Sequence, residues 1–406
     1  MKSKTLVCLT LLAVATLLIP AAQAQIFSVI HTFTGIGGDG ANPSAGVILR
    51  AGVLYGTTYQ GGLGGVNGRG TVYQMTHVGS NWNYKPIFLF PANGSGGANP
   101  SARVVFGPDL RLYGTTTAGG SFQKGVVFFL TAPISICRTL VCLWKEKVIY
   151  HFQGPPDGAE PMGDLTWDPD GNIYGTTVGG GPTQDEWGTA YELHSGNSWT
   201  EEVLHNFTRF GGVNPNAGLV YSGGKLFGTS PQGGLSGNGE IFELVFGFNW
   251  MENHLHDFAN QGDGSNAVGG LIMDASGSFY GATAGGGSGG GGVVYKEQFS
   301  GGTWTFLPIY SFAPYPGCGP AASLTMDNAG NLYGTTVCQG VNHLGNVFKL
   351  TKAGNTWVYS SLYDFTGGTD GEYPISTVTI DTDGTLYGIS QGGASRGLGV
   401  VWMIKP

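Results

Sequence analysis

The chain has 406 residues, of which 74 are glycine and 20 are proline, so long helices are excluded. A hydrophobic content of 41 %, with 12 % aromatic residues, supplies a packed core and excludes a disordered chain. The net charge of −8 argues against nucleic acid or an anionic membrane surface as a partner.

Residues 1–24 are typical of a cleaved export signal. Two lysines precede an apolar run from Leu6 to Ile19, and Ala22-Gln23-Ala24 has the small residues that signal peptidase requires. The apolar run is shorter than a membrane-spanning helix needs, so we expect no membrane insertion of the mature chain. We expect a secreted or periplasmic monomer that begins at Gln25 and forms one domain over residues 25–406.

The mature chain contains seven copies of one repeat, each centred on a string similar to NLYGTT. The aromatic residue of this string recurs every 53 to 61 residues, at Tyr55, Tyr113, Tyr174, Phe227, Tyr280, Tyr333 and Tyr387. Such a period, with four short strands per unit, is typical of propeller blades. The sequence therefore predicts an all-β chain that folds as a seven-bladed propeller of four-stranded antiparallel blades.

The sixth unit illustrates the four expected strands. Strand A is ASLTMD at 322–327, strand B is NLYGTT at 331–336, strand C is GNVFKL at 345–350, and strand D is 356–365. Asx-Gly turns separate A from B and C from D. A small residue opens every strand A, as expected of seven segments crowded around one axis: Ala45, Ala102, Gly163, Ala217, Gly269, Ala322 and Ser376.

The two ends of the mature chain predict how the ring closes. Six D strands carry a Trp eight residues before a Phe, whereas the last unit ends after its C strand, VVWMIK. The seventh Phe is Phe33, and Gln25 lies eight residues before it. We therefore expect the N-terminal segment from Ile26 to Phe33 to be the outer strand of the last blade, which removes open strand edges.

These motifs carry a family resemblance. YGTT followed by a glycine doublet, then GxVFxL and GNxW, resembles the GloVer tandem repeat of secreted bacterial proteins, and the match covers all seven units. The layout is also similar to that of kelch propellers. The resemblance implies a secreted propeller and no established chemistry.

Four cysteines remain after the signal, an even number that suits an oxidising compartment. Cys137 and Cys142 lie in one short insertion, and Cys318 and Cys338 lie in one repeat. We predict a disulfide within each pair. Zinc is the alternative, but neither C-x-x-C spacing nor clustered histidine accompanies these thiols.

Function is expected on the face formed by the B-to-C and D-to-A connections, here called the loop face, because these loops are long and irregular. A hydroxyl ends every strand B, and we interpret it as a tie to the following loop: Thr58, Thr116, Thr177, Ser230, Thr283, Thr336 and Ser390.

Four D-to-A loops contain Asp-Gly, which is first of all a turn signal: Asp39, Asp157, Asp263 and Asp370. Calcium at these loops stays an alternative, although no D-x-D-x-D cluster supplies its oxygens. We otherwise expect no cofactor and no metal.

Loop residues that break the repeat are the candidate ligand-binding residues. Trp187, with the acceptors Asp185 and Glu186 beside it, is the first candidate, and the other loop aromatics are Tyr59, Phe122, Phe210, Tyr315 and Tyr373. Aromatic rings beside hydrogen-bonding groups suit sugars, whose apolar faces stack while their hydroxyls pair. We therefore expect a binding module for extracellular glycan.

Two other classes of function remain open. Carboxylates such as Asp185 with Glu186, or Asp157 with Glu160 and Asp164, suit a polysaccharide lyase or glycosidase, although no catalytic motif is present. A scaffold that binds a cell-surface protein would fit the same surface. His31, His205 and His256 occupy a position that is aromatic in the other blades, so we interpret them as structural rings.

Overall fold

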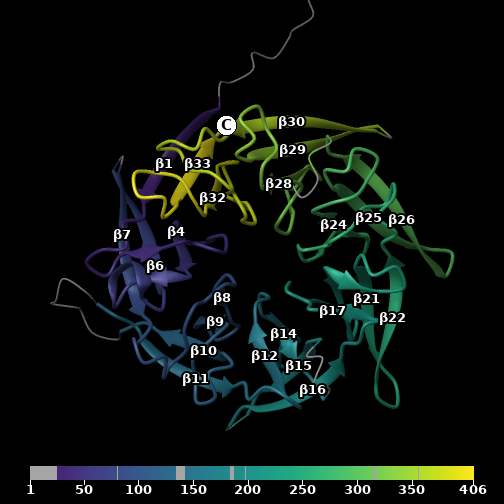
Figure 1. The fold of residues 1–406 in the computed structure, drawn as a ribbon, viewed down its shortest axis with the longest axis horizontal. Helices are drawn as coiled ribbons and strands as arrows, with labels where there is room; N and C mark the ends of the chain where they lie inside the picture. The colour runs from purple at the N-terminus through teal and green to yellow at the C-terminus, as the bar shows by residue number, and fades with distance from the viewer. Residues whose placement is uncertain are drawn as a thin grey trace, which may run out of the picture.

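The computed structural model describes residues 25–79, 81–133, 142–182, 187–196, 198–313, 315, 318–354 and 356–406. Seven antiparallel sheets stand around one axis, as Figure 1 shows. The predicted seven-bladed propeller is therefore confirmed. Among the described residues, the one helical element is the 3-10 turn η1 (Gly65–Asn67), and no helix there is long and apolar enough to cross a membrane. Residues 1–24, the predicted signal, lie outside the described residues.

Each blade has four strands in the order A, B, C, D from the axis outward. The first three blades are β3 (Ile48–Arg50), β4 (Val53–Thr58), β6 (Thr71–Val78) and β7 (Asn81–Leu89); β8 (Val105–Phe106), β9 (Leu112–Thr116), β10 (Val126–Thr131) and β11 (Lys145–His151); and β13 (Thr166–Trp167), β14 (Ile173–Gly180), β15 (Thr189–His194) and β16 (Thr200–Asn206). Blades four and five are β18 (Val220–Ser222), β19 (Lys225–Ser230), β21 (Glu240–Phe246) and β22 (Trp250–Asp257); and β23 (Ile272–Met273), β24 (Phe279–Thr283), β25 (Val293–Ser300) and β26 (Thr303–Ser311). Blades six and seven are β27 (Thr325–Met326), β28 (Leu332–Thr336), β29 (Asn346–Ala353) and β30 (Thr356–Asp364); and β31 (Thr379–Ile380), β32 (Leu386–Ser390), β33 (Val400–Lys405) and β1 (Ile26–Thr32).

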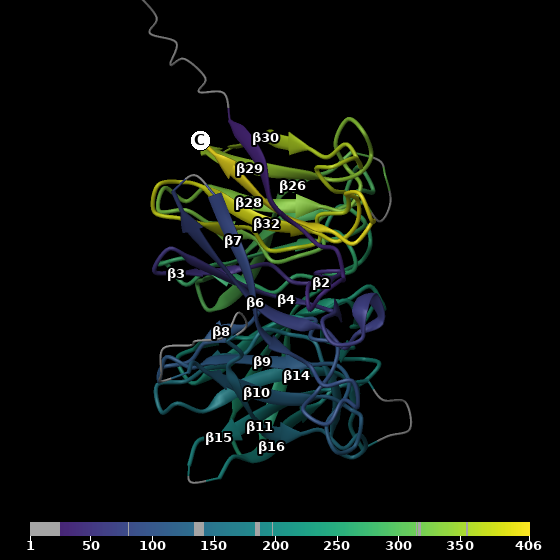
Figure 2. The ribbon, with the colours of Figure 1, turned by 90° about the vertical axis from the view of Figure 1, so that its left-hand side faces the viewer.

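The seventh blade takes its outer strand from the N-terminus, as predicted. Strand β1 pairs antiparallel with β33, from Ile26 opposite Lys405 to Thr32 opposite Val400. The two strands lie side by side in both views (Figures 1 and 2). Phe33, which follows β1, is fully buried in the cluster between the seventh and first blades. Closure therefore joins sequence ends that are more than 360 residues apart.

The glycine of each YGTT string has a packing role. A side chain at Gly56 would collide with the ring of Tyr73 on strand C, and one at Gly388 would collide with Trp402. The same approach of ring to backbone occurs in all seven blades, with the rings of Tyr73, Phe128, Tyr191, Phe242, Tyr295, Phe348 and Trp402. These rings are fully buried, so the strand B glycine makes room for a large aromatic core residue in each blade.

Strand A is shorter than the sequence predicts. In the sixth blade only Thr325 and Met326 form the strand, instead of the six residues 322–327. The preceding residues line the axis, and their carbonyls accept hydrogen bonds from the neighbouring blade: Thr335 Oγ1 donates to the carbonyl of Ser376 at 2.9 Å, and Thr176 Oγ1 to that of Ala217 at 2.9 Å. All seven predicted small residues line the axial channel.

Candidate functional site

The two kinds of irregular loop share one face of the ring, the right-hand side of Figure 2. In every blade the D-to-A connection forms an antiparallel bridge with the B-to-C connection that follows it. Five short strands and the end of β14 make three of these bridges: β2 (Gly40–Ala41) with β5 (Gln60–Gly61), β12 (Gly158–Pro161) with β14, and β17 (Gly212–Val213) with β20 (Gln232–Gly233). Single pairs make the other four, for example Ala98 with Ala118. The predicted loop face is therefore a continuous layer over the blades.

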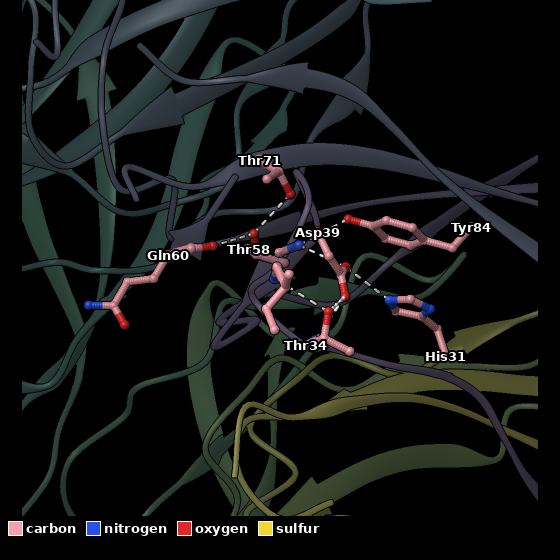
Figure 3. Close-up of polar contacts among 9 residues, drawn as sticks. His31, Thr34, Asp39, Thr58, Gln60, Thr71 and Tyr84 are labelled. Atoms are coloured by element: carbon pink, nitrogen blue, oxygen red, sulfur yellow. Dashed lines mark hydrogen bonds and ion pairs between the residues drawn. The ribbon is translucent and has the colours of Figure 1, made fainter. Parts of the chain in front are cut away.

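The repeated hydroxyls at the ends of the B strands lie beneath this layer. All seven are fully buried. Thr58 Oγ1 donates to the carbonyl of Gln60 at 2.7 Å and also contacts Thr71 Oγ1 (Figure 3), and Thr116 makes the matching bond to Ala118. Thr177 and Thr283 make the same bond to a loop carbonyl, so four of the seven hydroxyls tie the loop to the strand, as the sequence predicts. Thr336 instead donates to Asn346 Oδ1, and the hydroxyls of Ser230 and Ser390 have no hydrogen-bond partner among the described residues.

The Asp-Gly loops close on the ends of the D strands. Asp39 accepts hydrogen bonds from the backbone N–H and hydroxyl of Thr34, at 2.8 and 2.7 Å, and lies 3.1 Å from His31 Nε2 (Figure 3). Burial raises the pKa of Asp39, but the bonds from His31 and Thr34 outweigh it and hold this pKa below the usual value. His256 meets Asp263 in the same way, at 3.1 Å. The turn role of these aspartates is confirmed. His31 and His256 each contact the aspartate of the turn and so help to hold the loop.

Three D-to-A loops lack this aspartate, and they differ most from the repeat. The loop after β26 is held instead by a disulfide between Cys318 and Cys338, which confirms one predicted pair. Cys142 is also disulfide-bonded, whereas Cys137 lies outside the described residues, so the second pairing stays a prediction. The other two are the loop after β7, at 90–97, and the loop after β16, at 207–211.

The loop after β16 carries the strongest candidate site. Trp187, Arg209 and Phe210 together line two adjoining cavities of about 540 and 560 Å³ on the loop face, between the third and fourth blades. Phe210 is 73 % exposed, and Leu235 on the far wall of the first cavity is 76 % exposed. Trp187 is partly buried against the core cluster that contains Tyr174. Its carbonyl accepts a 2.8 Å bond from the N–H of Asn214, which fixes its backbone.

The other predicted ligand-binding residues are dispersed. Tyr59, Phe122 and Tyr315 are 36 to 51 % exposed and lie on loops of the first, second and sixth blades. Tyr315 contacts the ring of His343 at 4.5 Å. Asp185 and Glu186 lie outside the described residues, so their place beside Trp187 stays a prediction. The structure thus brings Trp187 and Phe210 together and leaves the remaining aromatics on separate blades.

A second feature lies on the axis of the ring. From the sequence we named one of its two residues, Asp164, but not its partner Arg103. Arg103 and Asp164 face one another across neighbouring A strands, with Nη2 2.5 Å from Oδ2, and they line an axial cavity of about 460 Å³. Asp164 also accepts the backbone N–H of Arg103 at 2.9 Å. The other five blades place uncharged residues at this position, namely Gly46, Gly218, Gly270, Ser323 and Thr377. Aligning all seven repeats would have revealed the charged pair.

The comparison with protein families finds one family whose repeat model matches the chain. The model of the Gloeobacter/Verrucomicrobia repeat matches residues 18–143, 141–308 and 245–406. The chain belongs to the Gloeobacter/Verrucomicrobia repeat family. This finding confirms the resemblance carried by the YGTT motifs, and the three matches together cover the whole described ring. The comparison with curated proteins found no match.

Solved structures share the propeller fold with this Gloeobacter/Verrucomicrobia repeat protein. A PL25 ulvan lyase bound to -[GlcA(1-4)Rha3S]- aligns with a TM-score of 0.53 and 11 % identity over 93 % of this chain and 95 % of the lyase. A second PL25 ulvan lyase structure gives 0.52 and 11 % over 90 % and 93 %. A glucose dehydrogenase gives 0.44 and 17 % over 94 % and 99 %. At these identities the likeness concerns the fold alone.

Two of the carboxylates named for the enzyme alternative, Asp157 and Asp164, have structural partners in this repeat protein. Asp157 accepts bonds from Tyr150 and from the backbone of Gln153, each at 2.9 Å. Burial raises the pKa of Asp157 in spite of these bonds. Asp164 is paired with Arg103 on the axis. Both groups therefore already have contacts that hold the ring together.

Proposed function

We propose that this repeat protein is a secreted glycan-binding module and that its ligand binds beside Phe210 on the loop face. The observation that carries the proposal is the meeting of Trp187, Arg209 and Phe210 around two adjoining cavities. Phe210 is 73 % exposed and lines both cavities, so its ring is available to stack on a ligand.

The chemistry of these three side chains favours a sugar ligand. The rings of Phe210 and Trp187 offer flat apolar surfaces, and the guanidinium of Arg209 offers up to five N–H donors for hydroxyl or carboxylate oxygens. Two joined cavities fit neighbouring residues of a chain better than one compact metabolite. Arg209 favours glycans that contain uronate or sulfate groups, because guanidinium can bind two oxygens of such an anion in a bidentate manner.

Two further observations support a role outside the cytoplasm. The disulfide between Cys318 and Cys338 is typical of an oxidising compartment. The PL25 ulvan lyase structures, whose folds are similar, include one bound to a glucuronate-containing saccharide, and this is a precedent for glycan recognition on a similar fold. We propose binding rather than cleavage because Asp157 and Asp164 are engaged elsewhere.

A screen with two readouts tests the proposal. The mature protein is applied to an array of neutral, uronate and sulfated glycans, and the same glycans are incubated with it and assayed for reducing ends and unsaturated products. We expect binding to one class of glycan, strongest for acidic chains, and no release of products. Product release would make the protein an enzyme. The absence of binding to every glycan, together with capture of one defined surface protein, would instead support a scaffold.

A further inference from the structure

A cluster of buried carboxylates and histidines lies in the fourth blade, outside the cavities that Phe210 lines. Glu240 begins β21, while His254 and Asp257 lie on the paired strand β22. Glu240 Oε2 is 2.6 Å from His254 Nδ1, and the same nitrogen is 3.4 Å from Asp257 Oδ1. One ligand atom from each of the three residues falls within 4.8 Å of the other two.

A β-bulge brings the two β22 residues to the same side. Residues three apart on a regular strand point to opposite faces, but the register of β21 and β22 shifts between Ile241 and Phe242, so Leu255 is an extra residue. The other blades have a bulge at the same place, for example between Val347 and Phe348. The geometry therefore belongs to the repeat, while the ligand residues belong to the fourth blade alone.

Glu240 is a carboxylate without a satisfactory partner. Its side chain is fully buried, and among the described residues Oε1 has no hydrogen-bond donor while Oε2 has only the contact with His254 Nδ1. The carboxylate of Glu252, on the paired strand β22, also lies nearby. Glu252 is itself balanced by His205, whose Nε2 lies 3.3 Å from its Oε2. A fully buried carboxylate with so few donors favours a positive charge beside it.

The sixth blade shows how the same positions are satisfied without an ion. There Asn346, Ser361 and Asp364 replace Glu240, His254 and Asp257. Asn346 Nδ2 donates to Ser361 Oγ at 3.1 Å, and Ser361 Oγ donates to Asp364 at 3.0 Å. Each acceptor oxygen in this series of hydrogen bonds therefore has a donor. In the fourth blade two carboxylates converge on one imidazole nitrogen, which is a donor set for a cation.

We propose that Glu240, His254 and Asp257 bind one zinc ion, with water at the fourth position. An imidazole nitrogen and carboxylate oxygens are zinc ligands, whereas calcium requires six or more oxygens. In a tetrahedral zinc site with bonds of about 2.0–2.2 Å, ligand atoms lie about 3.3–3.6 Å apart. The 3.4 Å separation of His254 from Asp257 matches this spacing, and the 2.6 Å contact with Glu240 opens once the ion enters. The side chain of His254 is 33 % exposed, which gives the ion a route from solvent.

Metal analysis of the intact mature protein tests this site. The protein is produced without a histidine tag, stripped with a chelator and titrated with zinc, and bound metal is measured by mass spectrometry after dialysis. We expect one zinc per chain and an X-ray absorption spectrum with nitrogen and oxygen neighbours but no sulfur. The measurement is made without glycan, so it stands apart from the proposed function.

Matched variants separate an ion from a buried proton. His254→Ala and Asp257→Asn should each lower the zinc affinity at least about 10-fold. His194→Ala is the control, since His194 also lies near two carboxylates, Glu192 and Glu202, but through different ring nitrogens. This variant should bind zinc as the parent does.

Glu240→Gln provides the second measurement. This variant keeps the shape and the neutral charge of a protonated Glu240, so the zinc-free protein should melt no lower than the parent while its zinc affinity falls at least about 10-fold. The absence of stoichiometric zinc binding in the parent, or a zinc affinity in His254→Ala and Glu240→Gln equal to that of the parent, would overturn the proposal in favour of a shared proton.

Discussion

At the scale of single residues, one repeated position decides how neighbouring blades meet. Six residues before the final Phe of strand D, four blades have an aromatic ring that stacks on the preceding blade, as Tyr84 does on His31 at 3.9 Å and Phe27 on Tyr363 at 3.6 Å. The other three blades have Glu146, Glu201 and Glu252 there. A carboxylate replaces a stacked ring at three consecutive interfaces. Burial raises the pKa of Glu146 and of Glu201, whereas contacts with His205 outweigh burial and lower the pKa of Glu252.

Glu146 gives the clearest case, because burial alone raises its pKa, to about 8. Its protonated form is favoured in the folded protein, so its stabilising effect is complete below the unfolded pKa of 4.5 and is lost as the pH rises from there through about 8. We expect Glu146→Gln to remove this loss, so that the variant gains on the parent between pH 5 and pH 8, by at most about 1.4 kcal/mol per pH unit. Urea unfolding at several pH values measures it. Parallel curves for the two proteins would show that Glu146 ionises normally.

At the scale of elements, the role of β1 in closing the ring can be tested by deleting this strand. Strand β1 supplies the outer edge of the seventh blade, and Phe33 fills the core between that blade and the first. Deleting residues 25–33 should uncover the edge of β33 and remove that core residue, which leads to aggregation or a loss of cooperative unfolding. Differential scanning calorimetry of the shortened and parent proteins measures whether cooperative unfolding is lost. A melt like that of the parent would mean that closure does not hold the ring.

The repeat made the elements predictable and left the sites largely hidden. Blade number, closure by β1 and the pair Cys318–Cys338 follow from spacing, because each depends on positions that recur. Arg103 and Asp164 lie on different blades and become a pair only through the ring, which no single repeat reveals. Likewise Trp187 and Phe210 lie on separate loops, whose paths depend on glycines rather than on a periodic pattern.

At the scale of the whole molecule, the ring combines seven similar blades with a few local departures. The repeated aspartates, hydroxyls and rings hold the blades together, and the departures that form the two proposed sites lie on the third and fourth blades: the Phe210 loop, its cavities and the Glu240 cluster. A repeat scaffold can vary such loops without disturbing its core, since the loops carry little of the packing. We therefore place the function of the molecule on this sector of the loop face.

The most direct test of this account is the affinity for the best glycan of the screen, measured by calorimetry for Phe210→Ala and Phe122→Ala. Phe122 is also an exposed loop phenylalanine, 51 % against 73 % for Phe210, but lies on the second blade. A stacked ring contributes about 0.5–1.5 kcal/mol beyond its buried area, so Phe210→Ala should weaken binding by about 2- to 12-fold or more while Phe122→Ala leaves it unchanged. Equal affinities for Phe210→Ala and the parent would contradict the account.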